Sequence, residues 1–350
     1  MRILSLFGLI ILFTTSLLCQ NKPYRVGTTA ATFLEMGAGS AGLAMGEAYV
    51  SMRSDVSSIY WNPSGLAYLE SKEVQFMYRP WVADIKSTFA ALAIPIDNVG
   101  TFALGIVSLD YGSTEVTTMT MQEGTGEMYS ATDLAISFSF ARKLADWFAF
   151  GATGKYITSK ISRLSASSIA IDLGVMINTD FLSQDGDRLN GLAIGMSISN
   201  YGTQMQYEGL ELLRPIDIAP NENGNFKDVE GQFKLQSWDI PLLFRLGVSF
   251  HPILTSSQRI TLSVDALHPN NNSESLNVGA EYQLKFPGAG TVYLRGGWRG
   301  LFMNESNYGL TLGGGVDVAL LNNVIFKVGY AYQDIGILGN YSSFTVGVVF

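Results

Sequence analysis

From about residue 130 onward, apolar residues recur at every second position, and single charged residues occupy some of the positions between them. Charges arranged in this way can line a water-filled passage and select solutes by their charge. They can also form ion pairs that hold an inserted segment or close the passage, and we favour this second interpretation. The candidate residues are Lys155, Asp172, Arg245, Asp265, Glu281, Lys285, Arg295, Arg299, Asp317 and Lys327.

Other residue patterns give no support for catalysis or a cofactor. Residues 37–42 (GAGSAG) match the dinucleotide pattern G-x-G-x-x-G, but that pattern has meaning only in a βαβ unit, and none is indicated here. His251 and His268 are the only histidines, and we expect them at different heights of neighbouring strands. We therefore predict no enzyme activity, no metal site and no cofactor. A lipase or protease is the alternative, because such sites are assembled in space rather than in sequence.

The elements that position these charges are short strands. Apolar residues alternate with small or charged ones, as in the apolar set Leu242, Phe244, Leu246, Val248 and Phe250. Successive side chains point to opposite faces of a strand, so the apolar set would face lipid and the other set a lumen. We expect about fourteen strands, at residues 74–80, 85–96, 99–110, 130–142, 146–160, 166–179, 190–201, 241–251, 258–267, 274–285, 291–299, 308–320, 324–333 and 341–350.

Composition agrees with a membrane barrel. Of the 350 residues, 47% are apolar, 12% are aromatic, 37 are Gly and only 15% are charged. Such a chain is too apolar for an ordinary soluble surface and too interrupted for a helical membrane protein, whereas a barrel spans lipid with short alternating strands. The net charge of −8, without a basic cluster, argues against nucleic acid as a partner. The predicted fold is an all-β, transmembrane, antiparallel β-barrel of the bacterial outer membrane.

An even strand number would place both ends of the barrel on the periplasmic side. The connections at residues 96–99, 142–146 and 320–324 would then be periplasmic, and the long ones at 110–130 and 201–240 would lie outside the cell. The 201–240 segment is acidic and contains Pro215 and Pro220. Long loops often carry function, so it is a candidate binding surface. A solvated loop that shields the barrel mouth is the alternative.

Two segments precede the barrel. Residues 1–19 have a basic start and an apolar core from Ile3 to Leu18, which predicts a cleaved signal peptide rather than an N-terminal anchor. Cys19 raises a lipoprotein alternative, which the large Leu18 before it disfavours. Residues 20–70 lack clean alternation, and we expect them to form a plug-like segment in or under the barrel at 71–350, with a short helical turn near residues 55–59 capped by Ser54 or Asp55.

The N-terminal block resembles the PorV/PorQ family, which belongs with the FadL-like fourteen-stranded outer-membrane barrels. The resemblance is sharp over about residues 37–70, and its most specific mark is the run YWNPSGL at residues 60–66. It implies that Trp61, Asn62 and Pro63 anchor an N-terminal segment in the lumen. The residues that match the family pattern are Gly42, Gly46, Tyr60, Trp61, Asn62, Pro63, Gly65 and Leu66.

The resemblance also implies a role. It is that of a component of the type IX secretion system that binds secreted cargo proteins and shuttles them at the outer membrane. A FadL-like importer of hydrophobic small molecules is the alternative, which would need an opening in the barrel wall. The three glycines at residues 313–315 are a candidate weak point for such an opening. A general porin would need an open lumen.

Overall fold

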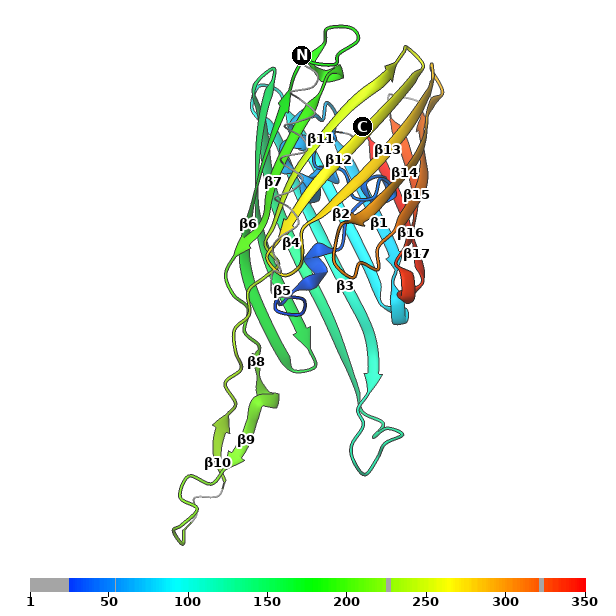
Figure 1. Ribbon diagram of the computed structural model, residues 1–350. Helices are drawn as coiled ribbons and strands as arrows, with labels where there is room; N and C mark the ends of the chain where they lie inside the picture. Colours follow the sequence, from blue (N-terminus) through cyan, green and yellow to red (C-terminus); the bar gives the residue numbers. More distant parts are fainter. Residues whose placement is uncertain (1–24, 54, 225–227, 321–323) are drawn as a thin grey trace, which may run out of the picture.

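The computed structural model describes residues 25–53, 55–224, 228–320 and 324–350 (Figure 1). The expected signal peptide lies outside these residues, as does Ser54. None of the helices among the described residues is long and apolar enough to cross a membrane.

Fourteen antiparallel strands form a closed ring, in which each strand pairs with its neighbour in the barrel and the first pairs with the last (Figure 1). The prediction of an all-β barrel of fourteen strands is thereby confirmed. The strands are β1 (Glu73–Pro80), β2 (Lys86–Ile96), β3 (Gly100–Glu115), β4 (Met128–Ala145), β5 (Phe148–Ile161), β6 (Leu164–Asn178), β7 (Ala193–Gly202), β11 (Leu243–Leu254), β12 (Gln258–Pro269), β13 (Ser275–Phe286), β14 (Gly290–Leu301), β15 (Leu310–Ala319), β16 (Ile325–Asp334) and β17 (Asn340–Val349).

Alternation along each strand explains why these residues form a barrel. In β1 the apolar side chains of Val74 and Phe76 are exposed on the outer surface, and Gln75 and Met77 are buried on the inner side. The exposed apolar side chains of the other strands continue this surface around the ring. Such a surface is stable only where lipid covers it.

The two ends of the barrel differ. We call the end at which β17 finishes the terminal end, and the opposite end the loop end. The connections β2–β3, β4–β5 and β15–β16 lie at the terminal end and are short. The long connections β3–β4 (residues 116–127) and β7–β11 (residues 203–242) project from the loop end (Figure 1).

The strand boundaries differ most from the predicted ones at the loop end of β3. This strand continues to Glu115 instead of ending at residue 110, across a register shift between Asp110 and Ser113. The β7–β11 connection is not a plain loop, because it contains β8 (Glu208–Gly209) and a hairpin of β9 (Leu213–Ile216) and β10 (Val229–Gln232). β8 pairs with the first residues of β6. Period-2 alternation is too weak a signal in such short, exposed strands.

Residues 32–68 lie inside the ring of strands (Figure 1). They form η2 (Thr32–Glu35), α2 (Ser40–Ala44), α3 (Ser58–Trp61) and η3 (Pro63–Tyr68). The expected turn near residues 55–59 begins later, at Ser58, and Asp55 accepts a hydrogen bond from the backbone N–H of Ser57. Below, residues 32–68 are called the inner segment.

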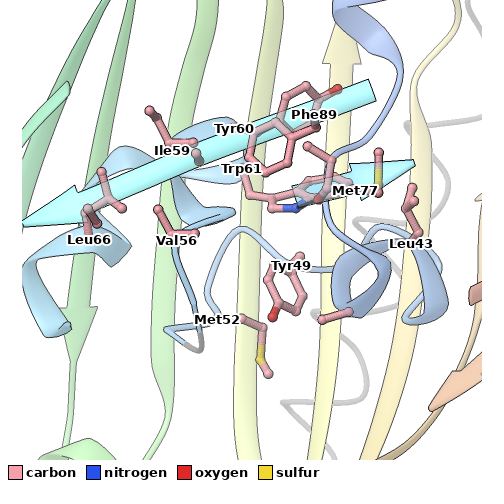
Figure 2. Packing of buried hydrophobic residues seen from close by; sticks show 14 of the residues in the cluster. Leu43, Tyr49, Met52, Val56, Ile59, Tyr60, Trp61, Leu66, Met77 and Phe89 are labelled. Atoms are coloured by element: carbon pink, nitrogen blue, oxygen red, sulfur yellow. Dashed lines mark hydrogen bonds between the residues drawn. The ribbon is translucent and has the colours of Figure 1, made fainter. Parts of the chain in front are cut away.

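Apolar side chains of the inner segment form a central cluster with residues of β1, β2, β3, β4 and β16. Trp61 is the largest fully buried side chain and packs edge-on against Tyr49 and Tyr60, at ring-centroid distances of 5.9 and 4.8 Å. Figure 2 shows this cluster, including Leu43, Tyr49, Met52, Val56, Ile59, Tyr60, Trp61, Leu66, Met77 and Phe89.

Inward-facing glycines allow the inner segment to lie directly on the strands. A Cβ atom at Gly151 of β5 would stand 2.4 Å from the carbonyl carbon of Pro63, and one at Gly195 of β7 would stand 2.3 Å from the carbonyl oxygen of Val50. No side chain fits in such a space. We call the following set the glycine ring: Gly105, Gly151, Gly174, Gly195, Gly247, Gly279, Gly297, Gly313 and Gly329.

The glycine ring gives a prediction with a matched control on one strand. Gly151→Ala in β5 should displace the inner segment and destabilise its packing against the barrel wall by about 1–3 kcal/mol, because the added methyl group overlaps the Pro63 backbone. The measurement is limited trypsin cleavage at Arg53 in the detergent-refolded barrel. Gly154→Ala, where the added Cβ meets no atom within 4 Å, should cleave like the wild type. Equal protection of both variants would show that the close contact at Gly151 carries no stability.

Candidate functional site

The YWNPSGL run connects the inner segment to the wall through backbone acceptors. The Asn62 Nδ2 amide donates to the carbonyl oxygen of Val50 at 2.8 Å and to that of Val175 in β6 at 3.0 Å. The Trp61 Nε1 donates to the carbonyl oxygen of Ala38 at 2.8 Å. Pro63 lies against Gly151 of β5. These contacts join two turns of the inner segment to two neighbouring strands.

The other family-pattern residues lie in the same core. Gly42 lies under the indole of Trp61, where a Cβ would approach to 2.7 Å, and Gly46 adopts a φ of 65° against the backbone of Trp298. The Tyr60 hydroxyl donates to the carbonyl oxygen of Leu34 at 3.0 Å, and burial raises the pKa of Tyr60 to about 12. The remaining two, Gly65 and Leu66, are also buried.

Six of the predicted lumen charges belong to ion pairs. Within the wall, Lys155 Nζ lies 2.6 Å from Asp172 Oδ2, and Arg295 Nε lies 2.7 Å from Glu281 Oε2. Two pairs involve acids that the sequence reasoning missed. Lys327 Nζ lies 3.0 Å from Glu73 Oε1 of β1, and Arg299 Nη1 lies 2.7 Å from Glu47 Oε1 of the inner segment. Alternation identifies inward charges only in regular strands, and Glu47 lies in a segment without alternation.

Two other lumen charges, Asp265 and Arg245, have neutral partners in the inner segment. Asp265 is fully buried and accepts the backbone N–H groups of Tyr49 at 2.7 Å and Val50 at 2.9 Å. The Arg245 guanidinium lies over the rings of Tyr60 and Trp61, at 5.4 and 5.6 Å from their centroids. These two side chains fix the inner segment at its centre.

Asp317 and Lys285 lie near the terminal ends of β15 and β13. Asp317 accepts a hydrogen bond from the Tyr293 hydroxyl at 3.0 Å and stands opposite Lys327 in the sheet. Lys285 is exposed near the terminal end of β13, which ends at Phe286, so it does not join the buried charges. Alternation assigned Lys285 to the inner face of its strand, but it did not predict that this residue lies near the terminal end.

Two cavities lie at opposite ends of the lumen. The terminal-end cavity, of about 440 Å³, is lined chiefly by polar side chains, including Arg53, Lys143 and His251. The loop-end cavity, of about 380 Å³, includes Tyr111 and Asp133. Lys143 and Asp133 both belong to β4 and are ten residues, or about 33 Å of strand, apart. The inner segment packs on the stretch between them.

The histidines do not form a joint site. His251 lies in the terminal-end cavity with its Nδ1 3.0 Å from the Thr261 hydroxyl, whereas His268 lies 3.0 Å from Glu274 at the other end of β12. Within the described ranges, no group of three or more His, Cys, Asp or Glu side chains is placed to hold a metal ion.

Removal of the Asp265 carboxylate should free the centre of the inner segment. In Asp265→Ala the backbone amides of Tyr49 and Val50 lose a charged acceptor, and hydrogen bonds to charged groups contribute about 1.5–3 kcal/mol each. Hydrogen exchange at these two amides should therefore quicken at least about tenfold. Asp317→Ala, which removes a carboxylate bonded to the wall residue Tyr293, should leave both rates unchanged. Equal rates in both variants would contradict the anchoring role of Asp265.

The fold has solved relatives with little sequence similarity. The toluene transporter TodX of Pseudomonas putida superposes with a TM-score of 0.56 at 10% identity, over 89% of this chain and 97% of that one. The toluene transporter TbuX of Ralstonia pickettii gives 0.53 at 11% identity, over 89% and 97%. A FadL homologue of Pseudomonas aeruginosa gives 0.52 at 12% identity, over 89% and 98%. At such identities the likeness shows a shared FadL-like fold alone.

No curated protein matches the chain in sequence. A family model described as "Type IX secretion system protein PorV" matches residues 19–268 of the 350. The fold and the family together indicate an outer-membrane protein of a group of channels and secretion components. With most of its length matched by that model, this chain belongs to the PorV family of outer-membrane β-barrels.

Proposed function

We propose that this barrel is a component of the type IX secretion system that binds exported cargo proteins at its loop end and carries them along the outer membrane. The observation that carries the proposal is the projecting β7–β11 connection, on a chain of the PorV family. Both ends of the barrel chain would lie on the periplasmic side, so the loop end would face the cell exterior.

The β7–β11 connection offers apolar side chains to a partner. In the β9–β10 hairpin and just after β9, Ile216 is 43% exposed, Ile218 63% and Val229 38%, and Ile216 stands opposite Val229 in the hairpin. The β9–β10 hairpin extends well beyond the barrel strands, so bilayer lipid would not cover these side chains (Figure 1). Contiguous apolar surface in water is typical of a protein interaction site.

The second long connection and the start of β4 add flexible apolar side chains. Met119 and Met121 of the connection are 95% and 55% exposed, and Met128, the first residue of β4, is 56% exposed. Methionine adapts its shape to different surfaces and is common where one protein binds many partners. A carrier of several cargo proteins requires such adaptability.

The contents of the lumen favour binding of a partner at the barrel surface over passage of a small molecule through the barrel. The inner segment occupies the middle of the barrel, and we propose that it acts as a plug. The importer alternative expected a weak point at Gly313–Gly315. Pairing of β15 is uninterrupted through these residues on both sides, so they create no opening in the wall. Both cavities described above are lined by polar groups as well as rings, unlike a pathway for hydrocarbons.

Deletion of the β9–β10 hairpin should remove most of the cargo binding without unfolding the barrel. The Phe233 N–H donates to the Leu212 carbonyl oxygen at 3.0 Å, so residues 213–232 can be replaced by a two-glycine turn. The tagged barrel is purified from native outer membranes in mild detergent, and bound proteins and lipids are identified by mass spectrometry. Wild type should retain secreted proteins with a common C-terminal domain, and the deletion should lose most of them.

A matched control truncates the other end. Replacing residues 182–189 of the β6–β7 connection by a short linker changes a terminal-end connection and should leave cargo recovery unchanged. Recovery of fatty acids or other apolar small molecules, with no partner protein, would overturn the cargo proposal and favour the importer.

A further inference from the structure

Three tyrosines surround the loop-end cavity. Tyr111 comes from β3, Tyr129 from β4 and Tyr207 from the β7–β11 connection. Among the other lining residues, Asp133 is the only charged one. Rings from three separate parts of the chain thus line the same cavity as one carboxylate.

A β-bulge directs part of this wall inward. The register between β3 and β4 shifts between Asp110 and Ser113, and Gly112 there adopts a φ of 73°. An extra residue in one strand changes which side chains face inward, and bulges commonly occur beside functional sites. Here Tyr111 at the shift and Thr114 after it both line the cavity.

Asp133 is buried at the base of the cavity with neutral partners. It is 7% exposed and accepts hydrogen bonds from the Tyr111 hydroxyl at 2.7 Å and from the Ser159 hydroxyl. Ser159 in turn lies 2.6 Å from the Tyr207 hydroxyl. In the part of the chain that the structure describes, no cationic side chain forms an ion pair with Asp133.

Apolar residues close the cavity toward the inner segment. Leu109, Ala135 and Ile157 are buried beside the lining residues, in one cluster with Phe33 and Leu34. A ligand in the cavity would therefore meet a carboxylate and aromatic rings on a water-excluding base. A buried charge without an opposite charge is costly unless a ligand supplies one.

We propose that the loop-end cavity binds an organic cation, an alkylammonium or guanidinium group, with Asp133 as its counter-ion. Carboxylate attraction and the faces of tyrosine rings both favour such a cation. A cavity of about 380 Å³ suits a small organic group. Calcium or magnesium would need several oxygen ligands around one point, and the cavity offers one carboxylate. This site does not depend on the cargo-binding role, and the cation belongs either to a free amine or to a lysine or arginine of a protein.

The test uses n-butylammonium as the probe and n-butanol as its neutral counterpart, titrated into the detergent-solubilised full chain and followed by ligand-observed NMR. Wild type should bind the ammonium and not the alcohol. Asp133→Asn should weaken ammonium binding at least about tenfold, because it removes the counter-ion but keeps the shape. Glu127→Gln removes a carboxylate from the same end outside the cavity and should bind like wild type.

A second variant tests the site even if Asp133→Asn fails to fold. Tyr129→Leu keeps Asp133, removes a partly exposed ring and should weaken ammonium binding several-fold. Folding of each variant is checked by the shift in electrophoretic mobility on heating. Equal binding of butanol and butylammonium, or unchanged binding by a folded Asp133→Asn, would overturn the proposal.

The pull-down described above distinguishes the two possible sources of the cation. If Asp133→Asn loses both butylammonium and cargo proteins, the cation is a side chain of the cargo. If it loses butylammonium and keeps cargo, the ligand is a free amine. Absence of cargo from the wild type would reject the secretion role, and the butylammonium titration would still decide the cation site.

Discussion

The backbone of the inner segment touches the backbone of the barrel wall, and the rest of the lumen is arranged around that contact. It requires positions without side chains on facing strands, which the glycine ring supplies. At Gly195 and Gly279 the nearest atoms are carbonyl oxygens of Val50 and Met45. The barrel is therefore closely packed at mid-height. Larger residues at the glycine positions would hold the inner segment away from the wall.

Charged groups complete this contact. Polar backbone groups of an irregular segment need partners when they leave water. Asp265 accepts two of them, Asn62 donates to two carbonyl oxygens, and Arg299 neutralises Glu47. Asp265, Arg245 and Arg299 thus have a local explanation, which is the irregular chain that they hold. The two cavities lie beyond this region, one at each end, so a ligand at the loop end meets the aromatic cavity before it meets the inner segment.

Alternation alone predicts much of this fold, because lipid and lumen impose opposite chemistry on successive residues. It located all fourteen strands and put Lys155, Asp172 and Arg245 on the inner face. It could not pair them, since partners such as Glu47 lie in a segment without periodicity. Nor could it find the loop-end cavity, because one inserted residue near Gly112 reverses the inward and outward positions. The YWNPSGL run identified the family and the importance of the inner segment, but its hydrogen bonds depend on strands more than 100 residues away.

The hydrogen bond from the Ser40 N–H to the Thr345 hydroxyl joins positions 305 residues apart, and it adjoins the seam at which β1 meets β17. A ring sealed by its first and last strands stays open until the whole chain has been synthesised and delivered. The inner segment precedes β1 and contacts strands from β3 to β17, so many of its contacts join residues far apart in the sequence. Contacts of such long sequence separation form slowly. The inner segment therefore cannot reach its final packing until the last strands are in place, because α2 contacts β14, β15, β16 and β17.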